Sequence, residues 1–257
     1  MAIQAQIVFS QPGTRKPEFI INPNGEAPTR KGSFAAIPVT IGNARTLPTP
    51  PEIEVQGFQL VQSDTNIPEF ASDNEIREIG YPEITAAILS VTGARTVRIF
   101  DHTVRTSAPS SGSRGTASHA HNDYTPKSFA GKLASLNIDP GDNRVIELNA
   151  WRPLSEPVVR SPLALADART IRPEDMIECA LVYPDRRGEI YELAHAPGQR
   201  WFFYPEMRRN ELLIFKGFDS DATNSVPFCP HTAFEHPDEK PGDPPRRSVE
   251  FRAAVIF

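Results

Sequence analysis

Short runs in which apolar and polar residues alternate fill most of the chain after residue 95. Each run is rich in β-branched or aromatic residues and ends near Pro, Gly or Asp, which is typical of β-strands. The runs are TVRIFDHTVRTS, NRVIELNAWRPL, GEIYELA, RWFFYP, ELLIFKGFDS and RRSVEFRAAVIF. A shorter strand is expected in GFQLV, after a proline-rich link. This pattern predicts a mainly β protein of the α+β class, built as a sandwich or jelly roll with helices packed on one side.

Two stretches have helical signals instead. Ser72 and Glu75 have the spacing of a capping box, and Pro82 can open a second helical stretch at its first position. Gly93 can end that stretch, whose apolar stripe is Ile84, Ile88 and Val91.

A further short helix is expected in TPKSFAGKLASLN. Thr125 would cap it and Pro126 would be its first residue. Its apolar stripe would be Phe129, Leu133 and Leu136.

The length of the chain allows one large domain or two small ones, and a full core in either case. No change of composition marks a boundary between domains. We therefore expect residues 1–257 to form one domain, with residues 1–56 as an N-terminal extension packed on it. These first residues mix polar, Pro, Gly and Asn positions, and their pattern predicts no particular element.

Composition narrows the classes of function. The 26 prolines disfavour a mostly helical protein, and the net charge of −5 implies neither a nucleic-acid partner nor an anionic membrane. The two cysteines, Cys179 and Cys229, lie far apart and match no zinc spacing, so core thiols in a reducing cytosol are expected. The chain starts without a charged and apolar leader and contains no apolar run of roughly 18 residues. We therefore expect a cytoplasmic protein without a membrane span.

Signatures of several common enzyme classes are absent from the sequence. There is no GxSxG, no Gly-rich phosphate loop, no GxGxxG and no HExxH. Their absence weakens the case for a serine hydrolase, a P-loop enzyme, a Rossmann dehydrogenase and a zincin.

The stretch SHAHNDYTPKS places His119, His121 and Asp123 at alternate positions, so that in a strand all three side chains point the same way. Such a set can converge on a metal, or it can be a polar strand end with no task. A second His-x-Asp pair, His236 and Asp238, lies among prolines and charges that indicate an exposed loop.

A third ligand is expected on a late strand, and FCPHTAFEHP supplies His231. Fifteen residues further on, Arg246 and Ser248 form an Arg-x-Ser pair, which suits a carboxylate because it offers a planar fork and a hydroxyl donor. Alternation places Arg246, Ser248, Glu250 and Arg252 on one face of that strand. Surface ion pairs are the competing interpretation for Arg247 and Arg252.

With these motifs in order, the chain resembles the CmcJ/AsaB/NvfI-type family of non-haem Fe(II)/2-oxoglutarate-dependent hydroxylases and desaturases of secondary metabolism. The resemblance extends from about Gly57 to Phe257. The blocks that carry it are TGARTVRIFDHTVR, HNDYTPKS, NAWRPL, PLALADAR, LVYPDRRGEIYEL, RWFFYPEM, ELLIFKGFDS, PHTAFEHP and RRSVEFRA. This sequence departs from the family pattern at Arg247, which leaves two arginines as candidates for the same contact.

The resemblance implies a double-stranded β-helix and the cofactors Fe(II), 2-oxoglutarate and O2. It implies His121, Asp123 and His231 as iron ligands, and Arg246 assisted by Ser248 as the anchor for the distal carboxylate of 2-oxoglutarate. The reaction would begin with hydrogen abstraction from a C–H bond of a small-molecule metabolite and would end in hydroxylation, desaturation, ring closure or endoperoxidation. A homodimer is the default assembly.

Several residues keep more than one interpretation. Arg152 would bind the cosubstrate, bind a substrate carboxylate or pair with Asp167. Four aromatic residues would line a substrate pocket or belong to the core, namely Tyr124, Trp151, Trp201 and Phe203. His119 is expected to affect the metal through its ligands rather than as a ligand. Two other functions stay open: a catalytically silent β-sandwich binding module and a cupin-type metal dioxygenase that uses no 2-oxoglutarate.

Overall fold

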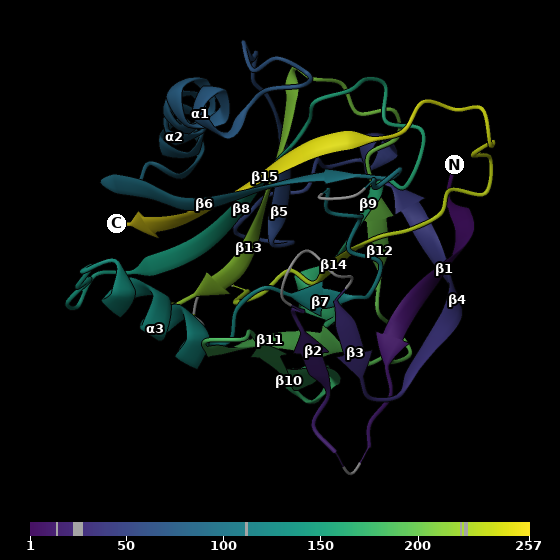
Figure 1. The fold of residues 1–257 in the computed structure, drawn as a ribbon, viewed down its shortest axis with the longest axis horizontal. Coiled ribbons are helices and arrows are strands. Elements are labelled where there is room, and N and C mark those ends of the chain that lie inside the picture. Colours follow the sequence, from purple (N-terminus) through teal and green to yellow (C-terminus); the bar gives the residue numbers. More distant parts are fainter. Residues whose placement is uncertain (14, 23–27, 111–112, 222, 224–225) are drawn as a thin grey trace.

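Two β-sheets pack against each other in the computed structural model, with helices beside the smaller sheet (Figure 1). The structure describes the whole chain except residues 14, 23–27, 111–112, 222 and 224–225. Within the described residues the smaller sheet has five strands, in the order β5 (Phe58–Gln62), β13 (Glu211–Asp219), β8 (Val145–Pro153), β15 (Arg247–Ile256) and β6 (Thr96–Thr106). All neighbouring strands in this sheet are antiparallel. The expected sandwich of short strands is confirmed.

The larger sheet has ten strands in the described part of the chain. Their order is β1 (Ile3–Ser10), β4 (Phe34–Asn43), β12 (Trp201–Phe203), β9 (Leu163–Ala166), β14 (His231–Ala233), β7 (His121–Asn122), β11 (Arg187–Leu193), β10 (Met176–Val182), β2 (Glu18–Ile20) and β3 (Thr29–Lys31). The first 56 residues therefore contribute four strands to this sheet. They occupy both of its ends, since β1 lies at one edge and β3 at the other.

The helical segment near the smaller sheet is continuous. It comprises α1 (Asp73–Glu75), a π-helical turn (Ile76–Gly80) and α2 (Tyr81–Thr92). The predicted capping box is confirmed, because the Ser72 hydroxyl accepts a hydrogen bond from the Glu75 N–H and the Glu75 carboxylate accepts one from the Ser72 N–H. Gly93 ends α2 with φ 64°, as predicted.

Pro82 does not start a separate helix. The chain is already helical at Gly80, and the π-helical turn lies directly before the proline, which has no N–H to give to the preceding turn. Gly80 permits this close packing, since a Cβ there would lie 2.8 Å from Phe251 Cζ and 2.9 Å from Ile67 Cδ1.

The third helix, α3 (Pro126–Ser135), begins at Thr125 as expected, and Phe129 and Leu133 are buried. Short 3₁₀ turns complete the set at Ala44–Thr46, Ala168–Thr170 and Pro173–Asp175. No helix in the described part of the chain is long and apolar enough to cross a membrane.

Two apolar clusters define the layers. The first covers the outer face of the smaller sheet, where Ile84 and Ile88 of α2 pack on Phe251 and Val255 of β15. The second lies between the sheets and combines residues of both, including Phe58, Trp151, Leu165, Leu213 and Phe215. The functional residues described below share the space between the sheets with this second cluster.

Candidate metal centre

Three residues of the larger sheet form a group that can hold a metal ion. His121 lies on β7, Asp123 follows that strand directly, and His231 lies opposite His121 on the antiparallel strand β14. The two imidazole rings are 4.5 Å apart, and His121 Nε2 lies 3.7 Å from Asp123 Oδ1. One ligand atom from each residue lies within 4.8 Å of the others. The structure thus brings together the three residues that the sequence motifs singled out.

Backbone carbonyls fix the orientation of both imidazoles. His121 Nδ1 lies 2.8 Å from the His119 carbonyl oxygen, and His231 Nδ1 lies 3.2 Å from the Cys229 carbonyl oxygen. A carbonyl oxygen only accepts, so each Nδ1 carries the proton and each Nε2 keeps its lone pair. This tautomer is the one that a metal ligand requires.

The pKa values of His121 and Asp123 are shifted in the directions that favour binding of a cation. Burial, followed by the charge of His231, lowers the pKa of His121 to about 3, so its ring is neutral at physiological pH. Burial alone would raise the pKa of Asp123, but Arg252 and the two histidines hold it well below its usual range. Two imidazoles and one ionised carboxylate therefore face one point.

Arg252 positions the carboxylate of the group. Its Nε donates to Asp123 Oδ2 at 3.2 Å, its Nη1 donates to Asp101 at 3.1 Å, and its Nη2 donates to Glu250 at 2.5 Å. Only 8% of Arg252 is exposed. The competing interpretation as a surface ion pair is therefore wrong for this residue, because Arg252 is buried and its guanidinium donates to three carboxylates.

The inner face of the smaller sheet is polar opposite the group. The alternation predicted for this strand is confirmed, since Ser248, Glu250 and Arg252 are buried on the side away from the core residues Val249 and Phe251. Arg246 directly precedes β15. Its guanidinium lies 5.4 Å from the centre of the Trp151 ring, and Nη1 donates to the Ser161 carbonyl oxygen. Burial, followed by the charge of Arg105, lowers the pKa of Arg246 to about 9.

Arg247 lies on the opposite side of the strand from this polar face. Its Nε donates to the Glu69 carbonyl oxygen at 2.8 Å, and its guanidinium lies 5.2 Å from the centre of the Phe70 ring. Of the two adjacent arginines, only Arg246 faces the space between the sheets.

Arg152 does not share that space either, which corrects all three interpretations offered by the sequence. Its Nη1 donates to the carbonyl oxygens of Ser63, at 2.5 Å, and of Arg209, at 2.8 Å. The reason is alternation: Trp151 points between the sheets, so its neighbour points outward. Asp167 instead pairs with Arg169 and Arg200, at 2.8 and 2.7 Å.

The aromatic candidates separate in the same way. Trp151 belongs to the cluster between the sheets, but Trp201 and Phe203 belong to another cluster with Phe9 and Ile41 on the other face of β12. The residue between them, Phe202, packs against the inner cluster. For Trp201 and Phe203 the pocket interpretation is therefore wrong, and the core interpretation holds.

Tyr124 lies beside the group, directly after Asp123. Its ring packs edge-on against Phe100 and Phe129. Burial, followed by the charge of Glu147, raises the pKa of its hydroxyl.

His119 points away from the group, although it is two residues before His121. Its ring packs edge-on against Phe34, with 4.7 Å between the ring centres, and burial lowers its pKa to about 4. The extended segment does not continue the alternation to this residue, since β7 comprises only His121 and Asn122. His119 reaches the group through its carbonyl oxygen, which accepts from His121.

Two buried polar residues of β8, Glu147 and Asn149, were not among the site residues expected from the sequence. Both are fully buried, and neither the Glu147 carboxylate nor the Asn149 amide has a hydrogen-bond partner among the described residues. Burial, followed by the charge of Asp123, raises the pKa of Glu147 well above its usual range. The signal was present in NRVIELNAWRPL, where these residues and Trp151 occupy alternate positions.

A facing pair of β-sheets with a buried His-Asp-His group between them defines a class of metal-binding jelly-roll proteins. Within that class, the family described as "Oxidoreductase/YMDC permease-like domain" matches residues 7–256. The Fe(II)/2-oxoglutarate-dependent dioxygenase nvfI of Aspergillus novofumigatus is 30% identical over 217 residues, which cover 80% of this chain and 78% of that protein. The hydroxylase/desaturase efuI of Hormonema carpetanum is 27% identical over 271 residues, which cover 91% and 88%. The chain therefore belongs to this family of Fe(II)/2-oxoglutarate-dependent oxygenases.

Solved structures agree with the fold. The iron and alpha-ketoglutarate-dependent endoperoxidase NvfI superposes with a TM-score of 0.87 at 24% sequence identity, covering 99% of this chain and 98% of that one. A variant of the same enzyme gives 0.89. The predicted jelly roll is confirmed by this match.

Proposed function

We propose that the protein is an Fe(II)/2-oxoglutarate-dependent oxygenase that removes hydrogen from a C–H bond of a small-molecule secondary metabolite. His121, Asp123 and His231 would hold the iron. The observation that carries the proposal is the convergence of two imidazoles and one ionised carboxylate within 4.8 Å, inside a family of such enzymes. This ligand set is the two-His, one-carboxylate triad of non-haem iron oxygenases, which leaves positions on the metal open.

The chemistry that Fe(II), 2-oxoglutarate and dioxygen supply together is oxidative decarboxylation of the cosubstrate coupled to hydrogen removal from a substrate. The protein's own share is to hold these components, orient them and keep water out. Arg252 helps to hold the metal, because its Nε donates to Asp123 and fixes that carboxylate. The carbonyl oxygens of His119 and Cys229 orient the imidazole rings of His121 and His231 toward the metal position.

The polar residues between the sheets fit 2-oxoglutarate. Arg246 Nε is buried without a hydrogen-bond partner among the described residues, and so are both polar atoms of the Asn149 amide. Unpaired buried donors of this kind are costly unless a ligand satisfies them. We place the distal carboxylate on Arg246, with the Ser248 hydroxyl beside it.

Apolar side chains enclose the other side of the group. The Phe215 ring centre lies 4.5 Å from that of His231, and Leu165 pairs with His231 across the sheet. This wall limits the access of water to the metal and provides surface for an organic substrate.

The test is anaerobic addition of Fe(II) and then 2-oxoglutarate to the purified chain. A weak visible band at roughly 500 nm is expected, as is typical of this cofactor pair. On admission of oxygen, the sample should form succinate. A protein that binds iron and consumes oxygen without succinate would instead be a cupin-type dioxygenase. A protein that shows neither the band nor succinate would be a catalytically silent binding module.

A further inference from the structure

Arg105 is a second arginine that faces the space between the sheets and that the proposed function does not use. It lies on β6, directly opposite Ser248 of β15 in the antiparallel register. Residues paired in this way point to the same side of a sheet. Its positive charge acts on Arg246, and the negative charges of Glu250 and Asp123 act on it. Arg105 therefore lies beside the proposed cosubstrate site.

We propose that Arg105 is the second cation of the 2-oxoglutarate site and binds the distal carboxylate together with Arg246 and Ser248. The inference rests on the proposed function and adds a residue to it. Three features of Arg105 support it: the lack of a carboxylate contact among the described residues, the free hydrogen-bond donors of its guanidinium, and the cavity beside it.

Among the described residues, the guanidinium groups of Arg105 and Arg246 donate to backbone carbonyl oxygens and form no ion pair with a carboxylate. Glu250 is the first acidic group that acts on Arg105, but its Oε1 already accepts a hydrogen bond from Arg252. Asp123 is likewise engaged by Arg252. In the described part of the chain, the two guanidinium groups thus face one space without a carboxylate in hydrogen-bond contact, and buried charged groups are stabilised by such contacts. A ligand with a carboxylate at this point supplies that contact.

Both arginines keep donors for such a ligand. Each guanidinium has five N–H groups. Among the described residues, the Arg105 guanidinium donates one hydrogen bond, from Nη1 to the Gly115 carbonyl oxygen at 3.1 Å. Arg246 likewise uses only Nη1, toward Ser161. A carboxylate has about four acceptor positions, enough for contacts from both arginines and a hydroxyl.

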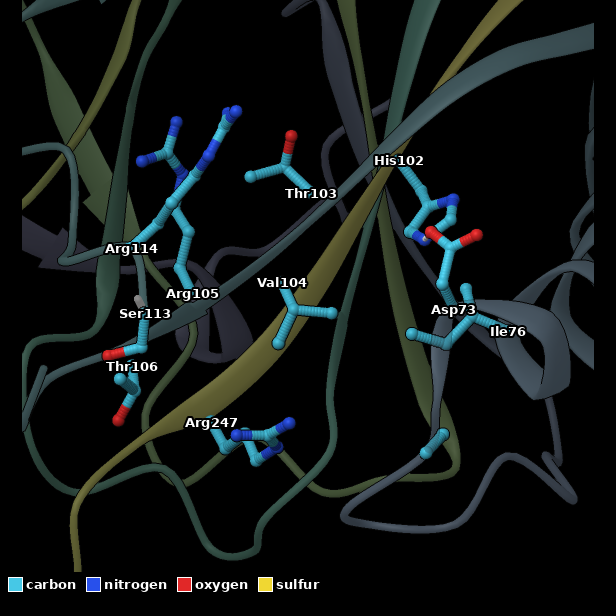
Figure 2. Close-up of a pocket in the computed structure, with 11 residues that line it drawn as sticks. Asp73, Ile76, His102, Thr103, Val104, Arg105, Thr106, Ser113, Arg114 and Arg247 are labelled. Carbon is cyan, nitrogen blue, oxygen red and sulfur yellow. Dashed lines mark ion pairs between the residues drawn. The ribbon is translucent and has the colours of Figure 1, made fainter. Parts of the chain in front are cut away.

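A cavity of about 380 Å³ along β6 gives Arg105 access to solvent. Figure 2 shows Arg105 and Thr103 on one side of the strand, whereas Val104 between them points to the other. Arg114 extends in the same direction as Arg105, and the two residues form an isolated bridge. Three arginines line this cavity, namely Arg105, Arg114 and Arg247, against one carboxylate, that of Asp73, so the cavity favours a small anion.

The experiment compares two cosubstrates in the Fe(II)-loaded protein under anaerobic conditions. 2-Oxopentanoate has the same keto-acid head as 2-oxoglutarate but a methyl group in place of the distal carboxylate. Titrations of the visible band give the affinity for each. We expect Arg105→Gln to weaken 2-oxoglutarate binding by about 10- to 100-fold, the usual effect of a lost charge-assisted contact. Binding of 2-oxopentanoate should change by less than about threefold, because it makes no such contact.

Arg98→Gln is the matched control, since Arg98 is an exposed arginine on the same strand. It should change neither titration. Arg105→Lys keeps the charge and should recover part of the selectivity for 2-oxoglutarate, which also covers the case in which the glutamine variant fails to fold.

Two results would overturn the inference. Equal weakening of both ligands would make Arg105 a structural residue, and unchanged binding of both would leave it to anchor an anionic substrate instead. Failure of the wild type to form the band with 2-oxoglutarate would refute the proposed function itself, which is a distinct outcome.

Discussion

The two faces of β15 meet different surroundings. On the outer face, Val249, Phe251 and Val255 pack beneath α2 in an apolar core. On the inner face, Ser248, Glu250 and Arg252 are buried, and Arg252 donates to Asp123 of the His-Asp-His group across the space between the sheets. One strand therefore serves the core and the site at once, because successive side chains point to opposite faces.

The energetics of the two faces differ as well. Each large side chain buried on the outer face contributes about 1.5–3 kcal/mol to stability. The inner face buries charges, which stabilise little even when paired and cost free energy when unpaired. Substitutions on the outer face should therefore reduce stability, and substitutions on the inner face should reduce ligand binding and turnover. Four predictions test this separation.

The largest effect is expected at the metal ligands. His121→Ala, Asp123→Ala and His231→Ala should each abolish succinate formation, because two ligands do not hold the iron in a catalytic geometry. Thermal unfolding of the metal-free proteins should change much less than activity, since these residues add little to the apolar core.

The second His-x-Asp pair provides the matched control. His236→Ala and Asp238→Ala should keep nearly full turnover, because the structure places neither residue in the group. If His236 proved essential and His121 dispensable, the late loop would be the true site.

The next effect is expected on the outer face. Phe251→Ala should lower the free energy of unfolding by about 3–5 kcal/mol, the usual cost of removing a buried phenylalanine. Its ring packs edge-on against Tyr81, with 6.0 Å between the ring centres. The affinity of the remaining folded protein for Fe(II) should be unchanged, as measured by titration below the unfolding temperature. A large loss of iron affinity without a loss of stability would contradict the separation of the faces.

A smaller effect distinguishes two neighbouring arginines. Arg246→Lys keeps the charge but loses the planar fork, so the apparent constant for 2-oxoglutarate should rise more than maximal turnover falls. The expected cost is about 2–4 kcal/mol, or about 30- to 1000-fold. Arg247→Lys should change little, because this residue contacts Glu69 and Phe70 on the other face. Titrations of both variants with 2-oxoglutarate test this prediction. A larger rise of the apparent constant for Arg247→Lys would make Arg247, and not Arg246, the anchor of the distal carboxylate.

The sequence predicted much of this arrangement because it depends on local patterns. The capping box at Ser72 follows from residues three positions apart, and the cap at Thr125 follows from the Thr-Pro pair at the helix start. The faces of β15 follow from strict alternation. The ligand set came from the family resemblance, because the His-x-Asp pattern alone also fits His236 and Asp238. Within the first 56 residues, β2 and β3 are only three residues long, too short to leave a pattern. β1 and β4 are eight and ten residues long, and the alternation in IQAQIVFS was a strand signal that was missed.

The errors have a common physical cause. A place in the site was one interpretation of Arg152, Trp201 and Phe203, and each lies one position from a residue that faces the space between the sheets. A strand pattern shows which residues share a face, but it does not show which face meets the other sheet. Arg252 was open to misinterpretation for another reason: its partner Asp123 is 129 positions away in the chain. Its burial depends on a contact between the sheets that no local pattern reveals.

The smallest expected effect concerns Arg252, which connects the strand to the metal group. Arg252→Lys keeps one positive charge beside Asp123 but cannot reach Asp123, Asp101 and Glu250 together as the guanidinium does. Loss of a residue that orients a metal ligand typically costs about 10- to 100-fold in metal affinity. We expect a loss of this size in Fe(II) titrations, with little change in the 2-oxoglutarate affinity of the iron-loaded protein, because Arg246 is intact. Arg98→Lys, on the neighbouring strand and exposed, should leave both constants unchanged. An unchanged iron affinity in Arg252→Lys would show that charge alone, and not the three-way geometry, holds the Asp123 carboxylate in place.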